Sequence, residues 1–168
     1  MTCNIQTEML KADEDIYIRI TEELKHFLKP DEPLISGLSN FISLLKYSLK
    51  KISWVGFYIN KEGNLWLGPF QGKPACVKIS SGKGVCGTVL IQGKTIIVED
   101  VDNFPEHIAC DAESKSEIVV PLFIHGNIWG VLDLDSNILN AFSETDKNYL
   151  EKICSFLAET LNFNESLI

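Results

Sequence analysis

Three cysteines lie near one another in the middle of the chain. Cys76, Cys86 and Cys110 fall within a stretch of 35 residues. A cysteine thiolate is a nucleophile, and a second thiol can condense with the sulfenic acid that forms on the first one. The pattern therefore indicates thiol-based redox chemistry.

Two aromatic residues flank a glycine on one face of an expected strand. Side chains alternate between the two faces of an extended chain. In the expected strand 52–59, Trp54, Gly56 and Tyr58 share one face, and the opposite face carries Val55, Phe57 and Ile59. Because glycine has no side chain, the pattern predicts a slot between the two rings.

Three acids occupy comparable positions in two later strands. Glu117 is the only charged residue of the expected strand 116–123, on the face opposite Ile118, Val120 and Leu122. In the expected strand 128–135, Asp133 and Asp135 share a face with Trp129 and Val131, whereas the other face carries Ile128, Leu132 and Leu134.

These acids and rings together suit a cationic substrate. An ammonium group interacts with carboxylates and with the face of an aromatic ring, and each aromatic contact contributes about 0.5–2 kcal/mol. A sheet with one solvated face would explain any single acid. Three acids together with Trp54 and Tyr58 favour a pocket for a small molecule that carries an amine.

The reactive cysteine is expected in a long segment without clear periodicity. Cys110 lies within residues 99–115, and a loop of that length in a small domain is usually functional or disordered. Its position next to the expected strand that carries Glu117 favours Cys110 as the nucleophile. His107 is close enough in sequence to contribute weakly.

The other two cysteines of the group have different expected surroundings. Cys76 alternates with Lys78, so we expect it on the face opposite Ala75, Val77 and Ile79. Cys86 lies among small residues near the start of an expected helix, 85–91, where the helix dipole could stabilise a thiolate. A purely structural role for Cys86 fits equally well.

The remaining cysteines and histidines are expected to be bystanders. Cys3 lies near the amino terminus, Cys154 lies beside the apolar stripe of the last helix, and His26 and His125 are expected in solvent. A zinc site would be the rival function for these residue types. The sequence contains no Cys-x-x-Cys or His-x-x-x-His pair that would support it.

Composition limits the class of protein. A chain of 168 residues with 45% hydrophobic content suits one domain, residues 1–168, in which we expect residues 1–12 to form a flexible tail. The net charge of −8 argues against nucleic acid and anionic membranes as partners. No long apolar run or signal peptide is apparent, and the odd number of cysteines does not suit a secreted disulfide framework, so we expect a cytoplasmic protein.

The periodicity predicts helices at both ends of an antiparallel sheet. Apolar residues recur at helical spacing over 16–28 and 34–49, and again in a helix that starts near Ser143, where Asp146 can form a capping box. Strands are expected at 52–59, 65–70, 75–79, 95–98, 116–123 and 128–135. Hairpin turns at Gly63 and Gly126 make this an α+β domain.

Several runs resemble one known family. The chain is similar to the free methionine-(R)-sulfoxide reductases over roughly residues 50–160, and the resemblance is carried by the runs 68–76, 84–88, 107–111, 116–121 and 130–136. The family's three-cysteine arrangement is present without a gap. This arrangement separates the family from the wider class of GAF domains that only bind small ligands.

The resemblance implies a fold and an activity. It implies a GAF fold, often dimeric, that reduces free methionine sulfoxide in defence against oxidative stress. By this likeness Cys110 is the catalytic thiol, and either Cys76 or Cys86 resolves it, with Cys76 ranked slightly ahead. The implied substrate pocket consists of Trp54, Tyr58, Glu117, Asp133 and Asp135.

The chemistry that the residues suggest agrees with this resemblance. The thiolate would attack the sulfoxide sulfur while Glu117 or Asp135 supplies a proton, methionine would leave, and the sulfenic acid would condense with a second thiol. Thioredoxin is the natural donor that would reduce the resulting disulfide. The reaction requires no metal and no organic cofactor.

Two other functions use the same residues differently. A GAF module that senses a ligand would signal to an output domain, for which this chain has no room. A thiol-based redox sensor without a substrate would leave the face that bears acids and aromatic rings unexplained.

Overall fold

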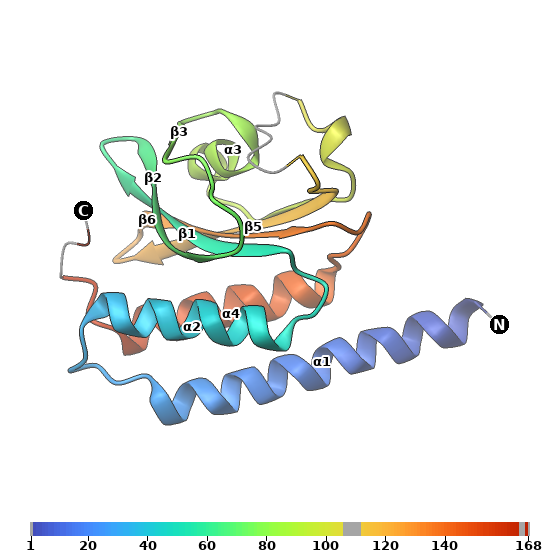
Figure 1. The fold of residues 1–168 in the computed structure, drawn as a ribbon. Coiled ribbons are helices and arrows are strands. Elements are labelled where there is room, and N and C mark those ends of the chain that lie inside the picture. Colours follow the sequence, from blue (N-terminus) through green and yellow to red (C-terminus); the bar gives the residue numbers. More distant parts are fainter. Residues whose placement is uncertain (1, 106–111, 165–166, 168) are drawn as a thin grey trace.

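The computed structural model describes the backbone of residues 2–105, 112–164 and 167, and the side chains of these residues from Asp13 onward. Four α-helices, six strands and a short 3-10 helix are formed in these ranges (Figure 1). In chain order they are α1 (Thr2–Phe27), α2 (Leu34–Ser48), β1 (Trp54–Lys61), β2 (Asn64–Gln71), β3 (Lys78–Ser80), α3 (Gly84–Gln92), β4 (Ile96–Val98), η1 (Val101–Asn103), β5 (Ser116–Ile124), β6 (Asn127–Ser136) and α4 (Glu144–Thr160).

All neighbouring strands of the single sheet are antiparallel. The strand order is β3-β2-β1-β6-β5-β4, so β1 and β6 are central although they are distant in sequence. The β1–β2 and β5–β6 hairpins turn through left-handed residues, Glu62 and Gly63 in one and His125 and Gly126 in the other. Two successive positive φ angles suit the right-handed twist of a hairpin. The prediction of an α+β domain with an antiparallel sheet is confirmed.

One face of the sheet is covered by three helices. α2 and α4 lie against the sheet and α1 packs on them from below (Figure 1). Most residues predicted for this face are buried in the large core there, among them Val55, Phe57, Ile118, Leu132 and Leu134, whereas Ile59 and Ile128 are not part of it. The period of two therefore assigned most positions of the central strands correctly.

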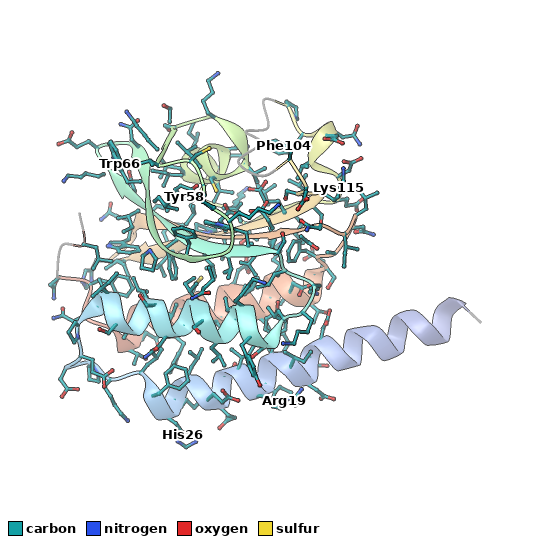
Figure 2. All side chains as sticks on the ribbon, in the orientation of Figure 1. Arg19, His26, Tyr58, Trp66, Phe104 and Lys115 are labelled. Atoms are coloured by element: carbon teal, nitrogen blue, oxygen red, sulfur yellow. The ribbon has the colours of Figure 1, made fainter. Side chains whose placement is uncertain are left out.

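The opposite face carries a smaller core under α3. Trp54, Tyr58, Val119 and Val131 pack there with residues of α3. In Figure 2, Tyr58 and Phe104 lie on this side of the sheet, whereas Arg19 and His26 lie at α1 on the far side. The two faces thus have separate roles, one stabilising the domain and the other forming a cavity.

The predicted face of Trp129 is wrong. The ring of Trp129 packs against Phe57 and Phe163 on the helix-covered side. The register between β5 and β6 shifts at Leu122 and Phe123, where Phe123 pairs with Ile128 and Leu122 with Gly130. A β-bulge of this kind places two residues opposite one and reverses the alternation beyond it.

The amino-terminal helix begins earlier than the apolar pattern suggests. Its first buried residue in the described part is Tyr17, yet the helix begins at Thr2 and its first turns extend past the other helices (Figure 1). The flexibility expected for residues 1–12 stays a prediction. Among the helices of the described ranges, none is long and apolar enough to cross a membrane.

Candidate active site

A cavity lies between α3 and the face of the sheet opposite α2 and α4. It encloses about 540 Å³, including open solvent at its mouth. All five side chains predicted to form the substrate pocket line it. The complete lining is Trp54, Tyr58, Lys73, Pro74, Ala75, Ile79, Lys83, Gly84, Val85, Cys86, Ser114, Glu117, Asp133 and Asp135.

Strand register brings the predicted residues together. Asp135 of β6 pairs with Trp54 of β1 on one side and with Glu117 of β5 on the other. One step along β6, Asp133 pairs with Gly56. Because directly paired side chains on one face lie about 5 Å apart, two rows of the sheet form the floor of the cavity.

The aromatic wall differs from the prediction of an open slot. The rings of Trp54 and Tyr58 stack with centroids 6.0 Å apart. A Cβ atom on Gly56 would lie 2.4 Å from the Trp54 ring, so the ring itself fills the space above the glycine. Glycine is needed there because the indole folds over it, and the predicted empty slot is wrong.

Both rings are fixed by hydrogen bonds to the segment that follows β2. Trp54 Nε1 donates to the carbonyl oxygen of Lys73 at 3.0 Å, and the Tyr58 hydroxyl donates to that of Cys76 at 3.0 Å. Burial and the surrounding acids raise the pKa of Tyr58 above its ordinary value, so the hydroxyl remains a donor. These bonds tie the cysteine segment to the aromatic wall.

Glu117, Asp133 and Cys86 form a buried cluster at the inner end of the cavity. Their exposed fractions are 5%, 6% and 3%. Burial raises the pKa of Asp133 well above its ordinary value, and Asp135 and Glu117 raise it further. Burial and then Asp135 likewise raise the pKa of Glu117. Side-chain hydrogen bonds join Asp133 to both of the other groups.

The environment of Cys86 does not favour a thiolate. The residue lies in the first turn of α3, but burial raises the pKa of its thiol, and Asp133 and Glu117 raise it further. Desolvation and the neighbouring acidic side chains thus outweigh the helix dipole, whose effect is worth about 0.3–1 kcal/mol. The predicted stabilisation of a Cys86 thiolate is wrong.

Asp135 differs from the two buried acids. It is half-buried and accepts a hydrogen bond of 2.6 Å from the Ser114 hydroxyl. The nearby ion pair between Lys73 and Glu113 links the segment after β2 to the segment before β5. Asp135 therefore lies at the more open part of the cavity, where a substrate can approach it.

Cys76 lies beside the cavity in an oxidised state. It is disulfide-bonded, whereas Cys86 and Cys154 are free thiols. The predicted opposition of Cys76 to Ala75 and Val77 is wrong, because Ala75 and Cys76 both pack against the smaller core and Val77 is 66% exposed. These residues precede β3, so the alternation of a strand does not apply to them.

Three of the predicted residues lie wholly or partly outside the part of the chain that the structure describes. Cys110 and His107 fall outside the described residues, and the side chain of Cys3 does too. Cys154 is buried in the large core on the helix-covered side. His26 and His125 are exposed, as expected.

Lys73, Lys83 and Ser114 also line the cavity, and the sequence did not single them out. Lys83 stands at the N-cap of α3, inside the Gly-rich loop 80–84, which was the available signal. Lys73 and Ser114 lie in irregular segments. No periodicity could assign them to a face.

Comparison with known proteins identifies the family. The GAF domain family matches residues 14–161. A free methionine-R-sulfoxide reductase of Escherichia coli is 40% identical over 147 residues, which cover 88% of this chain and 89% of the relative. The chain belongs to the free methionine-R-sulfoxide reductase family of GAF domains. A protein of the same name from Saccharomyces cerevisiae is 44% identical over 137 residues, 77% of this chain and 76% of its own.

Solved structures of the family share the fold. The protein fRMsr of Staphylococcus aureus in its reduced form has a TM-score of 0.82 and 46% identity, and the match covers 85% of this chain and 93% of that one. The free methionine-R-sulfoxide reductase of Neisseria meningitidis, solved in complex with its substrate, has a TM-score of 0.79 and 41% identity, with 89% of each chain covered. The predicted GAF fold and the predicted family are confirmed.

Proposed function

We propose that this protein reduces free methionine-(R)-sulfoxide to methionine. The observation that carries the proposal is the cavity in which Trp54, Tyr58, Glu117, Asp133 and Asp135 meet beside an oxidised Cys76. Relatives at 40–44% identity carry the name of this enzyme. An apolar wall suits the S-methyl end of the substrate, and the acids suit its polar groups.

Cys110 is the nucleophile in this proposal and Cys76 is the resolving thiol. Cys76 is half-buried next to the cavity and forms a disulfide with a cysteine that is neither Cys86 nor Cys154. Cys86 is a free, buried thiol with a raised pKa, which suits a weak nucleophile. These observations favour Cys76 over Cys86 as the residue that condenses with the sulfenic acid.

The reaction balances with two thiols and no other oxidant. The Cys110 thiol and the sulfoxide yield methionine and a sulfenic acid on Cys110, because the oxygen passes from one sulfur to the other. The Cys76 thiol then displaces that oxygen as water and forms the disulfide. Thioredoxin, our proposed donor, supplies two electrons and two protons by exchange and regenerates both thiols.

Glu117 is our choice for the side chain that protonates the sulfoxide oxygen. It lines the cavity, and burial and then Asp135 raise the pKa of its carboxyl, which favours the protonated form. Asp135 is more exposed and hydrogen-bonds to Ser114, which suits binding of the substrate's ammonium group. The buried acids and Asp135 thus take different parts in one site.

A coupled assay tests the proposal directly. Reduced thioredoxin, thioredoxin reductase and NADPH are mixed with the protein and with each epimer of free methionine sulfoxide, and NADPH oxidation is followed. We expect turnover with the R epimer and none above background with the S epimer. Binding of the R epimer without NADPH oxidation or methionine release would instead indicate a GAF module that only senses a ligand.

A further inference from the structure

Three groups that can bind a metal converge at the inner wall of the cavity. The Cys86 Sγ atom and one carboxylate oxygen from each of Glu117 and Asp133 lie within 4.8 Å of one another. The three residues come from α3, β5 and β6, so no short sequence motif reveals the cluster. All three side chains are more than nine-tenths buried.

A second observation points to a missing ligand. Among the described residues, Asp133 Oδ1 is a buried side-chain atom without a hydrogen-bond partner. Native proteins rarely leave such an acceptor unsatisfied in the interior. Because Asp133 lines the cavity, a cation bound beside Cys86 and Glu117 would satisfy this oxygen.

We propose that Cys86, Glu117 and Asp133 form a zinc-binding site that is open to the substrate cavity. One sulfur and two oxygens are donors that Zn²⁺ accepts, whereas Mg²⁺ and Ca²⁺ require ligand sets made of oxygen. Three protein ligands leave the fourth tetrahedral position facing the cavity. Binding releases the Cys86 proton, and any proton on the two carboxyls, to solvent.

The geometry requires only a small adjustment. Zinc–ligand distances of about 2.0–2.3 Å place the donors of a tetrahedral site roughly 3.5 Å apart. The three atoms lie within 4.8 Å of one another, so side-chain rotations that move these atoms by about an ångström bring them to these distances. The backbones that hold them are paired strands and a helix, and these need not move.

The consequence for the enzyme is inhibition. A zinc ion held by Glu117 and Asp133 occupies the acids that face the sulfoxide, so metal and substrate exclude each other. This consequence rests on the proposed function, whereas binding of the metal does not.

Cobalt spectroscopy and calorimetry test the site. Protein with the Cys76 disulfide intact is titrated with Zn²⁺, and with Co²⁺ as a spectroscopic probe. We expect one ion per chain, a thiolate-to-cobalt charge-transfer band, visible bands of tetrahedral intensity and no heat of binding with Mg²⁺. Absence of binding, or binding of cobalt in an octahedral all-oxygen site, overturns the proposal.

Matched variants separate this site from adventitious ones. Cys86→Ala should remove the charge-transfer band and weaken zinc binding by more than about 100-fold, since even outer-shell changes cost 10–100-fold. Cys154→Ala removes the other buried free thiol of the described residues and should change neither. Unchanged binding in Cys86→Ala assigns the metal to another site and overturns the proposal.

Thermal unfolding shows whether a variant loses metal binding because it misfolds. A ligand that binds only the native state raises its midpoint, so Zn²⁺ should stabilise the wild type and Cys154→Ala but not Cys86→Ala or Glu117→Gln. Addition of Zn²⁺ to the coupled assay then tests inhibition that free methionine sulfoxide relieves. If the protein proves inactive in that assay, the cobalt spectrum and the unfolding shift still decide the metal site.

Discussion

In the proposed reaction, the acids of the cavity have different tasks because they are buried to different depths. Glu117 and Asp133 are deeply buried and bonded within their cluster, and their raised pKa values favour the protonated forms. Asp135 is half-buried, and its carboxylate accepts a hydrogen bond from Ser114. In the proposed function, Asp135 therefore binds the cation of the substrate, and the two buried acids face the sulfoxide oxygen.

The first prediction concerns the selection of a free amino acid. N-acetyl methionine sulfoxide lacks the ammonium group, so its kcat/KM should be at least about tenfold lower than that of free methionine sulfoxide. The gap should narrow in Asp135→Asn, because the variant no longer presents a carboxylate to the cation. Glu62→Gln, in the exposed β1–β2 turn, is the control of equal charge change. Equal efficiency on both compounds would refute the cation pocket.

The second prediction separates the two reacting thiols. Cys110→Ser should release no methionine in a single turnover, because serine lacks a readily ionised nucleophile. Cys76→Ser should release one methionine per chain and then stop, because the resolving thiol acts after methionine has left. Rapid-quench measurement of methionine against steady-state NADPH oxidation distinguishes the variants. A normal steady state in Cys76→Ser would transfer the resolving role to Cys86.

The third prediction is a pH dependence of stability that comes from Cys154. Burial and then Glu151 raise the pKa of this thiol from 9.0 to about 12. The unfolded chain therefore loses the Cys154 proton at a lower pH than the folded chain, and stability falls as pH rises through this window. Between pH 8 and pH 10 the wild type should lose about 1.4 kcal/mol more than Cys154→Ala.

Urea unfolding at the two pH values measures this loss. The cavity that alanine leaves lowers the free energy of unfolding equally at both pH values, so only the difference between the two losses is used. Equal losses in the two proteins would mean that Cys154 titrates alike in the folded and unfolded chains.

Residue types in the sequence identified the site, but not the state of each group. Trp54, Glu117 and Asp135 were predicted correctly as cavity residues because a period of two assigns the faces of regular strands. The raised pKa of Cys86 depends partly on Asp133 and Glu117, which lie on β6 and β5 and not on the same helix. The local spacing of residues in the sequence encodes neither these contacts between elements nor the depth of burial.

At the scale of elements, one buried carboxylate joins three parts of the fold. Asp146 at the start of α4 accepts a 2.7 Å hydrogen bond from Tyr17 of α1 and forms a 2.7 Å ion pair with Lys51, which precedes β1. It also accepts a 2.8 Å bond from the Ser143 backbone, which completes the predicted capping box. The cap of α4 thus also anchors α1.

The fourth prediction compares this residue with its capping partner. Asp146→Asn removes the buried ion pair with Lys51, which keeps Asp13, and weakens the bond from Tyr17, so it should lower the free energy of unfolding by about 3 kcal/mol. Ser143→Ala removes only a cap and should cost about 1 kcal/mol. Glu144→Gln, at a surface ion pair, should change stability by less than about 0.5 kcal/mol. Urea denaturation checks the order, and equal costs for Asp146→Asn and Ser143→Ala would contradict it.

The β-bulge in β6 shows where periodicity fails to predict the face of a residue. Helices and strands followed from periodicity, and most of their bounds agree with the structure, except that α1 begins at Thr2 and β3 begins at Lys78. Trp129 did not follow, because an inserted residue reverses the faces and leaves no mark in a run of apolar residues. Cys76 was assigned to a strand that begins only at Lys78, so its face was wrong as well.

At the scale of the whole molecule, the extent of the domain can be tested by truncation. The GAF domain match begins at residue 14, Asp13 of α1 forms an ion pair with Lys51, and Tyr17 is the first buried residue among those whose side chains are described. The first turns of α1 extend away from the other helices in Figure 1. A flexible segment 1–12 and the homodimer that the family resemblance implies both stay predictions.

The fifth prediction is that deletion of residues 1–12 changes the free energy of unfolding by less than about 1 kcal/mol. Deletion of residues 1–20 also removes Tyr17 and Ile20 from the core and should cost more than about 3 kcal/mol. Urea unfolding compares the two, and light scattering shows whether a dimer depends on the first segment. A large loss with the shorter deletion would place residues 1–12 within the folded domain.

The strand order also sets the timing of folding during synthesis. β1 pairs with β2, its neighbour in sequence, but its other edge can pair only after β6, which begins at Asn127, has been synthesised. The core beneath α1 and α2 needs Leu150 and Leu157 from the last helix. A nascent chain on the ribosome therefore carries an unpaired β1 edge and exposed apolar helices until nearly all residues have emerged. We expect such a nascent chain to be prone to aggregation, because the two strands of the central pair lie so far apart in the sequence.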